Sequence, residues 1–408
     1  MRPSLLLQLF CVIWLATIFV FSVATRDDWP SVSSTRDEVA LQGIVYDILE
    51  QGGIRQTVRV VVADVPGRVQ ARIGGISLLH IGDRVRVACK PTPIRDVYAE
   101  TFRYDRYLAK ERVSLLCDSY ASPEVVGFEL IFQSRMARIR DGFEVALSRV
   151  LPEPHRSLLV GLLYGARSML PSDVVEDFRR TGTMHIVAVS GFNVMIVTEA
   201  LFWTLTVFMR RQRAFFIIVI GLVAYVLFAG AGPGVVRAAI MGGLVLLARQ
   251  LGRPRATLTL FLIAACAMVA INPRILLDDV GFQLSFAAAA GLTWLSPRIA
   301  PRLSWITPSW MRSILSDTLA AIAATMPISL LQFHQFALVA PIANLFIVPL
   351  VAPTMIVGAV LSLLSMAVGA VGFDGVATVI MLPVYAMLDI ILALVHAFSP
   401  LPFLDLTL

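Results

Sequence analysis

The chain has 408 residues, of which 57% are hydrophobic and 15% are charged, and its formal net charge is +6. This hydrophobic fraction, gathered in long uninterrupted runs, excludes a soluble globular domain and indicates an integral membrane protein. The positive charge does not by itself indicate a nucleic-acid-binding protein, because many arginines lie in short loops beside apolar runs, where membrane topology alone would place them.

The first predicted element is a transmembrane anchor within residues 1–24. Residues 5–24 form an apolar run of spanning length behind Arg2. The stretch Ser22-Val23-Ala24 also resembles a small-residue cleavage site, so a removed signal peptide is the alternative. We favour the anchor because the run is longer than the usual apolar region of a signal peptide. Either interpretation sends the following domain to the outer side of the membrane.

Residues 38–120 are predicted to form a small extracytoplasmic β-barrel. Short strands with alternating polarity are separated by Gly, Pro and Asp turns, and five strands in about 80 residues suit an oligonucleotide-binding (OB) type of barrel. One connection carries several aromatic residues, which fit either base stacking or, more commonly, core packing. They are Tyr98, Phe102, Tyr104 and Tyr107.

Two cysteines, Cys89 and Cys117, end strand-like runs of this barrel. Each has the sequence parity of its inward-facing neighbours, so both thiols are expected to point into one core. Outside the cytoplasm they fit a disulfide, and two buried free thiols fit equally well. Neither these cysteines nor Cys11 and Cys266 have the spacing of a metal site, so we predict no metal.

The remainder of the chain is predicted to be helical. Residues 127–180 are amphipathic, with arginines among apolar residues, and indicate interfacial helices against the membrane lipids. Residues 181–400 are predicted to form a transmembrane channel domain of about eight spans. The candidate spans are 184–209, 214–232, 234–250, 256–271, 279–296, 314–333, 350–371 and 375–397.

Arginines flank these spans in an alternating pattern that predicts the orientation. Every second loop is rich in arginine, and the loops between are poor in basic residues. The arginine-rich loops are therefore expected in the cytoplasm, with the N-terminus, and the barrel outside it, in a multi-pass inner-membrane protein. The arginine-rich groups are Arg210, Arg211 and Arg213, then Arg249, Arg253 and Arg255, then Arg298, Arg302 and Arg312.

Residues 181–199 hold the most informative group of polar residues within a span. His185, Ser190, Gly191, Asn193 and Glu199 interrupt apolar sequence, where polar groups are costly unless they face a cavity or another helix. On one unbroken helix His185, Ser190 and Asn193 would share a face, and a break at Gly191 would instead expose backbone groups to an aqueous path. Simple interhelical hydrogen bonding is the alternative.

Three further segments place polar residues near the same predicted path. Arg237 follows Pro233 by one turn, where it would face an entering phosphate or extend to the interface. Gln283 and Ser285 lie near the outer end of a small-residue helix. Asn344 lies among prolines at 341, 349 and 353, which predict a re-entrant or discontinuous helix at 335–348.

Catalytic motifs are mostly missing from the sequence. We find no phosphate-cradling loop and no metal-ligand motif, so we predict neither a cofactor nor ATP hydrolysis or metallonuclease activity. An intramembrane serine hydrolase is the remaining enzymatic alternative, with Ser190 as nucleophile and His185 or His334 as base. His185 lies five residues before Ser190 on the same predicted helix, which is poor geometry for such a pair.

In these segments the chain resembles the ComEC-type competence proteins, which carry single-stranded DNA across the cytoplasmic membrane during natural transformation. The resemblance rests on the order of several motifs from about residue 40 to residue 365. They are TFRYDRYLAKERV and LLVGLLYGA, HIVAVSGFNV at 185–194, RAAIM at 237–241, the NP…GFQLSF pair from Asn272 to Phe286, and PIANLFIVPL.

The resemblance implies a non-enzymatic DNA channel whose path includes His185, Ser190, Gly191, Asn193, Arg237, Gln283, Ser285 and Asn344. It implies three partners besides DNA: a cytosolic helicase or translocase, an outer DNA receptor and a separate nuclease. Two departures stand out. Asn193 replaces a common family histidine, and the metallo-β-lactamase-like domain of many members does not follow Leu408. A permease or exporter for another polyanion is the rival function, and the sequence does not indicate an oligomeric state.

Overall fold

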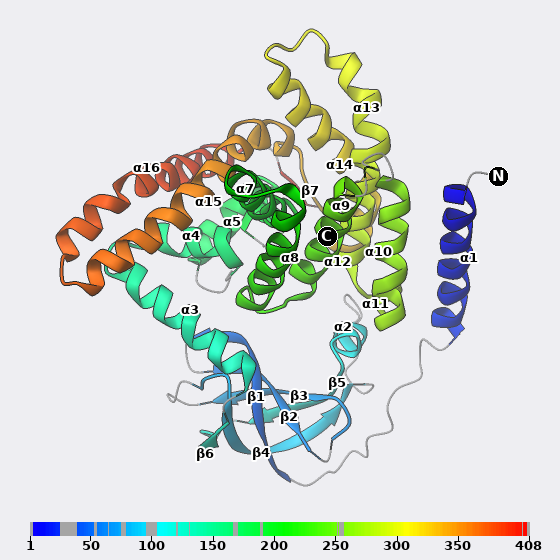
Figure 1. Cartoon of the computed structure of the whole chain (residues 1–408). Coiled ribbons are helices and arrows are strands. Elements are labelled where there is room, and N and C mark those ends of the chain that lie inside the picture. The colour runs from blue at the N-terminus through cyan, green and yellow to red at the C-terminus, as the bar shows by residue number, and fades with distance from the viewer. Residues whose placement is uncertain are drawn as a thin grey trace. The chain divides into compact units, whose positions relative to one another are not determined.

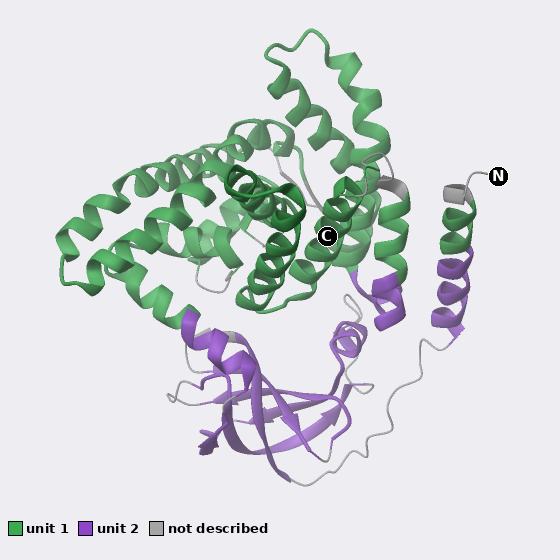
Figure 2. Ribbon diagram, viewed as in Figure 1, with its two compact units in different colours: residues 1–12, 140–266, 280–408 green, residues 13–139, 267–279 purple. Residues whose placement is uncertain are grey.

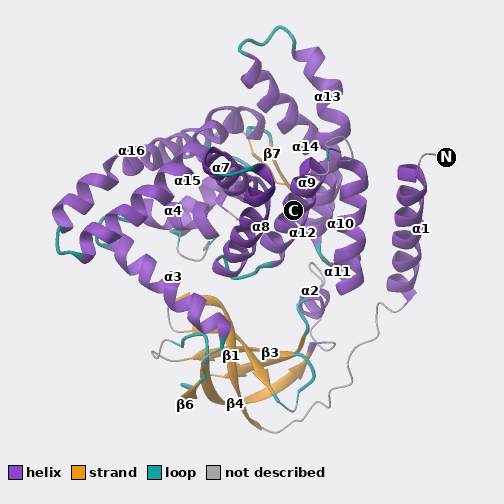
Figure 3. Ribbon diagram, in the orientation of Figure 1, coloured by secondary structure: helices purple, strands orange, loops and turns teal. Residues whose placement is uncertain are grey.

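The computed structural model describes residues 3–24, 39–52, 55–63, 65–74, 79–94, 104–119, 121–129, 131–165, 170–187, 191–250, 252, 257–401 and 403–405. These residues form two compact units (Figure 2). Unit 2 comprises residues 13–139 and 267–279, and unit 1 comprises residues 1–12, 140–266 and 280–408. Strands dominate unit 2 and helices dominate unit 1 (Figure 3).

Unit 2 is built on a closed β-barrel (Figure 1). The strands follow the order β1-β2-β3-β5-β4-β6, and a further pairing of β1 with β4 closes the ring. β3 and β5 are parallel, and the other pairs are antiparallel. This five-stranded ring, to which β6 adds at β4, confirms the predicted OB-like barrel. The strands are β1 (Val39–Gly52), β2 (Arg55–Val62), β3 (Arg68–Gly74), β4 (Asp83–Pro93), β5 (Val113–Ser119) and β6 (Glu124–Phe128).

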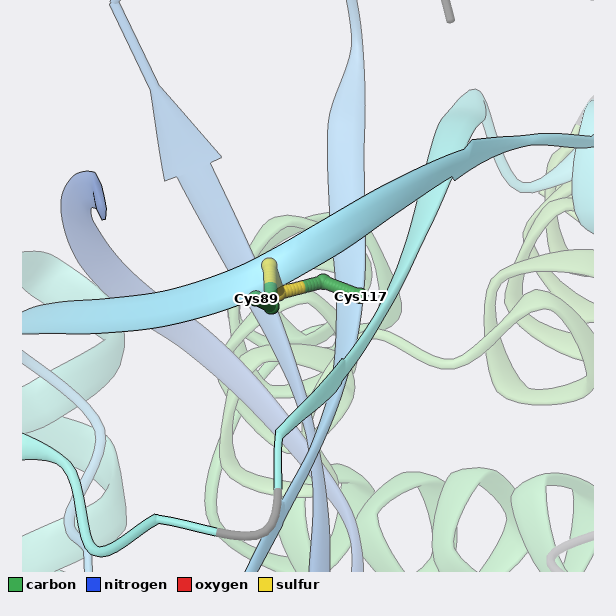
Figure 4. Close-up of a disulfide and its surroundings, with 2 residues drawn as sticks. All are labelled: Cys89 and Cys117. Atoms are coloured by element: carbon green, nitrogen blue, oxygen red, sulfur yellow. A yellow bond between two sulfur atoms is a disulfide. The ribbon is translucent and has the colours of Figure 1, made fainter. Parts of the chain in front are cut away.

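The barrel core follows from strict alternation along its strands. In β4 every second residue from Val85 to Pro93 is buried, and Cys89 and Cys117 both lie in the hydrophobic core. A disulfide joins these two cysteines across neighbouring strands, with their Cα atoms 5.6 Å apart (Figure 4). The expected parity of the two thiols is what brings them together.

The aromatic connection of the barrel packs inward where the structure describes it. Tyr104 and Tyr107 belong to α2 (Tyr104–Lys110) and stack with ring centroids 6.0 Å apart. Gln70 donates a hydrogen bond of 2.8 Å to the Tyr104 hydroxyl, and both tyrosines pack on a small core around Leu108. Tyr98 and Phe102 lie outside the described residues.

Helices make up almost all of the remaining described chain. In order they are α1 (Pro3–Ala24), α3 (Phe132–Ser148), α4 (His155–Tyr164), α5 (Ser172–Arg180), α6 (Met184–Val187), α7 (Gly191–Phe208), α8 (Arg211–Phe228), α9 (Pro233–Gln250), α10 (Thr257–Ile271), α11 (Ile275–Asp278), α12 (Val280–Ala290), the π-helix η3 (Gly291–Leu295), α13 (Ser296–Ile299), the 3₁₀ helix η4 (Ala300–Leu303), α14 (Ser309–Phe333), α15 (Ala340–Ala370) and α16 (Asp374–Phe398). Two short strands, β7 (Gln335–Ala337) and β8 (Phe403–Asp405), pair with each other.

Six of the described helices are long and apolar enough to cross a membrane: α1, α7, α8, α14, α15 and α16. Together with the barrel they make the chain a polytopic α-helical membrane protein with an OB-like domain. The helix α10 is apolar but shorter. The predicted span 279–296 is instead a series of α12, η3 and α13, in which a π-helical turn interrupts the α-helical geometry.

A close helix crossing joins this series to α14. A Cβ atom placed on Gly291 would lie 2.5 Å from the backbone oxygen of Ala320 and 2.8 Å from the Cβ of Ala324. The two backbones therefore approach so closely that only glycine fits at residue 291. This contact holds α12 and α14 side by side in Figure 1.

The prolines after residue 335 act differently from the sequence-based expectation of a discontinuous helix. α15 runs without interruption for 31 residues, with Pro349 and Pro353 inside it. Pro341 lies in its first turn, where the missing N–H costs nothing. In apolar surroundings a helix keeps its remaining backbone hydrogen bonds, so the two inner prolines are accommodated rather than ending it. The break lies earlier, at β7 and the turn before Ala340.

Candidate functional site

Three of the motif segments meet in one hydrophobic core of unit 1. This core contains Leu158 and Leu162 from α4, Ile186 and Val187 from α6, and Ile347 from α15. The glycine of the first segment is required there, because a Cβ on Gly161 would lie 2.8 Å from a methyl group of Val187. Segments separated by more than 150 residues in the sequence therefore share one packed core.

Asn193 lies inside this element and is fully buried. Its side-chain amide donates a hydrogen bond of 2.9 Å to the carbonyl oxygen of Leu162 and a longer one of 3.5 Å to that of Ile186. Both acceptors belong to the last turns of helices, where carbonyl groups have no partner within the helix. Asn193 thus joins α7 to the ends of α4 and α6.

The polar stretch around Asn193 is divided between two helices, α6 and α7. The residues between them, 188–190, lie outside the described residues, and so does the predicted role of Ser190. Gly191 opens α7 and is exposed, and a Cβ atom placed on it would have no described atom within 4 Å. His185 is exposed as well, and its Nδ1 lies 3.1 Å from the carbonyl oxygen of Gly182. Since a carbonyl only accepts, Nδ1 carries the proton and Nε2 is left as an acceptor.

Arg237 connects two other motif segments. It is 8% exposed on α9, and its Nε donates a hydrogen bond of 3.0 Å to the hydroxyl oxygen of Ser285 on α12. On the neighbouring turns of α9, Val235 and Ala238 pack against Val194 of α7. The arginine side chain is therefore held between helices instead of extending to an interface. Gln283 lies half-buried two residues before Ser285 on the same helix.

Asn344 is buried in the second turn of α15. Its Oδ1 atom has no hydrogen-bond partner among the residues that the structure describes. A buried acceptor without a partner is costly, which sets Asn344 apart from Asn193 and its two hydrogen bonds. The turn that leads into α6 packs on the start of α15, because a Cβ atom placed on Gly182 would lie 2.8 Å from the Cβ atom of Ala340.

The Asn272 end of the NP…GFQLSF motif belongs to unit 2. Asn272 donates a hydrogen bond of 3.0 Å to the carbonyl oxygen of Lys110 at the end of α2, and the Lys110 ammonium lies 3.1 Å from an Asp279 carboxylate oxygen. This motif therefore has two roles, since its first half fixes the connection 272–279 on α2 and its second half carries the polar residues of α12.

Three half-buried acidic residues have partners that the sequence did not predict. Glu199 forms an ion pair with Arg249, and the Asp317 carboxylate accepts a hydrogen bond from Ser296. Glu144 of α3 accepts a hydrogen bond from the Tyr164 hydroxyl. Burial raises the pKa of the Glu144 carboxyl, and burial together with this carboxyl raises the pKa of Tyr164. An acidic residue inside an apolar segment is the signal that identifies Asp317 and Glu199 from sequence.

Together these contacts connect the motif segments in one series: α4, α6 and α15 share a core, Asn193 ties α7 to α4 and α6, α7 packs on α9, and Arg237 links α9 to α12. The polar groups along it are hydrogen-bond donors, acceptors and one guanidinium group. A guanidinium group and N–H donors are groups that bind anions by charge and hydrogen bonding.

Comparison with known proteins places these segments in a family. The model of the family described as Competence protein matches residues 162–408, which is more than half of the chain. The chain is 27% identical to ComE operon protein 3 of Bacillus subtilis (strain 168) over 375 residues, covering 89% of this chain and 47% of that protein. It is 25% identical to the uncharacterized protein YcaI of Escherichia coli (strain K12) over 211 residues, covering 49% of this chain and 28% of that protein. The chain thus spans less than half the length of these curated relatives. No solved structure matches it.

Proposed function

Because this chain belongs to the competence protein family, we propose that it is a channel through which single-stranded DNA crosses the cytoplasmic membrane during natural transformation. The barrel faces the outside of the cell and the arginine-rich loops face the cytoplasm, as positive charge in short loops requires. A cytosolic helicase or translocase supplies the work of transport, while an outer receptor delivers the DNA and a separate nuclease removes the other strand.

The observation that carries this proposal is the buried Arg237 of α9, hydrogen-bonded to Ser285 of α12. A charged side chain within apolar helices is expensive and commonly marks the pathway of an ion or substrate. A guanidinium group has five N–H donors in a planar fork, which matches the oxygens of a phosphate better than a lysine ammonium does. Arg237 therefore suits repeated transient contact with a sugar-phosphate backbone.

Arg237 and the less buried polar residues of the site line the proposed path, and the two buried asparagines lie behind it. His185 and Gly191 are exposed, Gln283 and Ser285 are half-buried, and in this proposal they offer side chains or backbone to the DNA. Ser190, which lies outside the described residues, belongs to the same proposed path. Asn193 is buried and bonded to the ends of α4 and α6, so it positions these helix ends, and Asn344 is buried on α15. This division supports a conduit in which DNA contacts weak hydrogen-bonding groups in succession and is not held at one tight site.

Labelled DNA uptake in a strain that lacks the gene tests the proposal. Complementation with the wild-type chain should restore entry of labelled DNA into the cytoplasm, and Arg237→Glu should abolish it, because a carboxylate repels the phosphates. Arg237→Lys should retain part of the uptake. Arg180→Glu, a charge reversal on the exposed surface of α5, is the matched control and should behave as the wild type.

Membrane extraction and thermal unfolding must show that the Arg237 variants insert and fold. Uptake that is unchanged by deletion of the gene contradicts the proposal altogether. Normal uptake with a folded Arg237→Glu chain removes this arginine from the path. Competition of uptake by a small polyanion, with no loss on adding excess DNA, would instead favour the permease.

A further inference from the structure

The turn between α13 and α14 carries two exposed tryptophans. Trp305 is 77% exposed and Trp310 is 51% exposed, although large aromatic side chains are usually buried. The turn projects from the paired helices α12 and α14 in Figure 1. It begins at η4 and ends at the first turn of α14, and hydrogen bonds such as that from Ile306 N to Leu303 O fix its backbone.

The same turn is positively charged. Arg298 and Arg302 are exposed, and Arg312 is half-buried. No Asp or Glu occurs from residue 280 to residue 316, so no acidic side chain of this stretch offsets the three guanidinium charges. One N–H of Arg298 and one of Arg302 donate to backbone carbonyl oxygens of the turn before them, which holds the two groups in place and leaves further donors of each.

Exposed tryptophans beside arginines also occur at membrane surfaces, but the position of Asp317 argues against lipid burial here. α14 has 25 residues, so it is about 37 Å long and exceeds the about 30 Å of a bilayer core. Residues 318–333 carry no charge, whereas Asp317 and Arg312 lie in its first turns. A carboxylate is costly in the bilayer core, so Asp317 is placed at its boundary and the helix residues before Asp317, at the tryptophan end, lie outside the core. Trp310 lies about 10 Å beyond Asp317 along the helix, and Trp305 precedes the helix altogether.

We infer that this turn, residues 297–312, is a binding platform for single-stranded nucleic acid, on which bases stack on Trp305 and Trp310 and phosphates pair with Arg298, Arg302 and Arg312. Aromatic faces with nearby cations are the common means of binding single strands without sequence preference. The prolines at 297, 301 and 308 restrict the backbone, which lowers the entropy cost of binding.

The inference rests on the proposed function for its ligand and extends it with a site at the opposite end of the helix pair. Ser285, the partner of Arg237, is separated from this turn by the second half of α12 and by η3, about 18 Å as far as Pro297. By the arginine pattern the turn lies on the cytoplasmic side. A strand leaving the channel would meet it there, and stacking would oppose its backward movement.

Binding of a labelled oligothymidylate to the full chain in phosphatidylcholine nanodiscs, followed by fluorescence anisotropy, tests the platform. Trp305→Ala and Trp310→Ala should each weaken binding by roughly 5- to 150-fold, the range for loss of one stacked base. Trp305→Phe should keep most of the affinity because it keeps an aromatic face. Trp203→Ala is the matched control, since Trp203 is 69% exposed within the candidate span α7. It should bind as the wild type.

Two further measurements separate the platform from a lipid anchor. The double substitution Arg298→Gln and Arg302→Gln should reduce the slope of log affinity against log salt by about 0.7 for each arginine. Brominated phosphatidylcholine should quench as much tryptophan fluorescence in the Trp305/Trp310 double variant as in the wild type. It should quench less tryptophan fluorescence in Trp203→Ala. Loss of bromolipid quenching in the double variant would place the two rings in the bilayer and overturn the inference.

The inference is also overturned if the double tryptophan variant binds oligothymidylate as tightly as the wild type. It is overturned as well if the wild-type chain does not bind oligothymidylate. Either result leaves the channel proposal standing if Arg237→Glu still blocks DNA uptake. Conversely, uptake that is independent of the gene refutes the channel, whatever the turn binds.

Discussion

Replacing Asn193 tests whether this buried amide holds the ends of two helices together. The substitution Asn193→Leu keeps the branched shape of the side chain but removes the donor to the carbonyl oxygens of Leu162 and Ile186. Leu162 lies in the last turn of α4, where carbonyl groups have no partner within the helix, so its oxygen loses the donor that the described residues provide.

The expected loss of stability follows from these contacts. An unsatisfied buried acceptor costs about 1–3 kcal/mol, and the bond of 2.9 Å to Leu162 places the loss in this range. The second bond, at 3.5 Å, adds little. Asn193→Asp should cost more, because it turns a carboxylate toward two carbonyl oxygens in a buried site.

Thermal unfolding in detergent, monitored by light scattering, measures the effect, and uptake of labelled DNA is compared per amount of folded protein. Thr206→Ala is the matched control on the same helix, because the Thr206 hydroxyl donates to two carbonyl oxygens of its own helix, α7, and to no other group that the structure describes. It should change stability by less than about 0.5 kcal/mol. An Asn193→Leu chain that is as stable as the wild type would refute the helix-end role, and loss of uptake in that stable chain would place the amide on the DNA path.

Three further predictions concern other parts of the fold. Glu144→Gln should make the protein more stable than the wild type at neutral pH, and this advantage should vanish as the pH falls to about 4.5. The reason is that the raised pKa of Glu144 makes the stability of the wild type fall as the pH rises through the pKa of the folded state. Thermal unfolding at a series of pH values measures this, and a parallel pH dependence of the two proteins would contradict it. Gly291→Ala should lower stability by about 1–3 kcal/mol because its Cβ meets a backbone oxygen, whereas the control Gly243→Ala, with 3.9 Å to the nearest atom, should have little effect in the same assay. Cys89→Ala should destabilise the barrel by about 3–4 kcal/mol, which is the chain-entropy value for a disulfide loop that spans 28 residues. Faster proteolysis of the barrel should report this loss of stability. Equal protease resistance of the variant and the wild type would argue against this role of the disulfide.

The barrel was predictable because its information is local. Strand parity and turn residues indicate which side chains face inward, and the burial of Val85, Val87 and Cys89 follows that alternation. The closure of β1 on β4 was not predictable in this way, because it depends on pairing between residues about 45 positions apart.

The sequence predicted which polar residues belong to the helical site better than it predicted which groups they contact. A polar residue in an apolar segment indicates a cavity, another helix or a backbone group, and sequence does not distinguish among these partners. Asn193 faces carbonyl groups of α4, and Glu199 pairs with Arg249, each contact joining segments 31 or more residues apart. The prolines of α15 were misinterpreted for a related reason, since neighbouring helices decide whether an inner proline ends a helix.

The parallel pair of β3 and β5 has a consequence for how the barrel reaches its folded state. Arg68 is aligned with Val113, so the ring stays open until the chain as far as Ser119 is available. Until then the edges of β3 and β4 that will pair with β5 present unpaired backbone groups, which attract other extended chains. Folding that depends on such distant pairings is slow. If this domain is exported, it therefore crosses the membrane as an open chain and needs protection from aggregation until its last strand arrives.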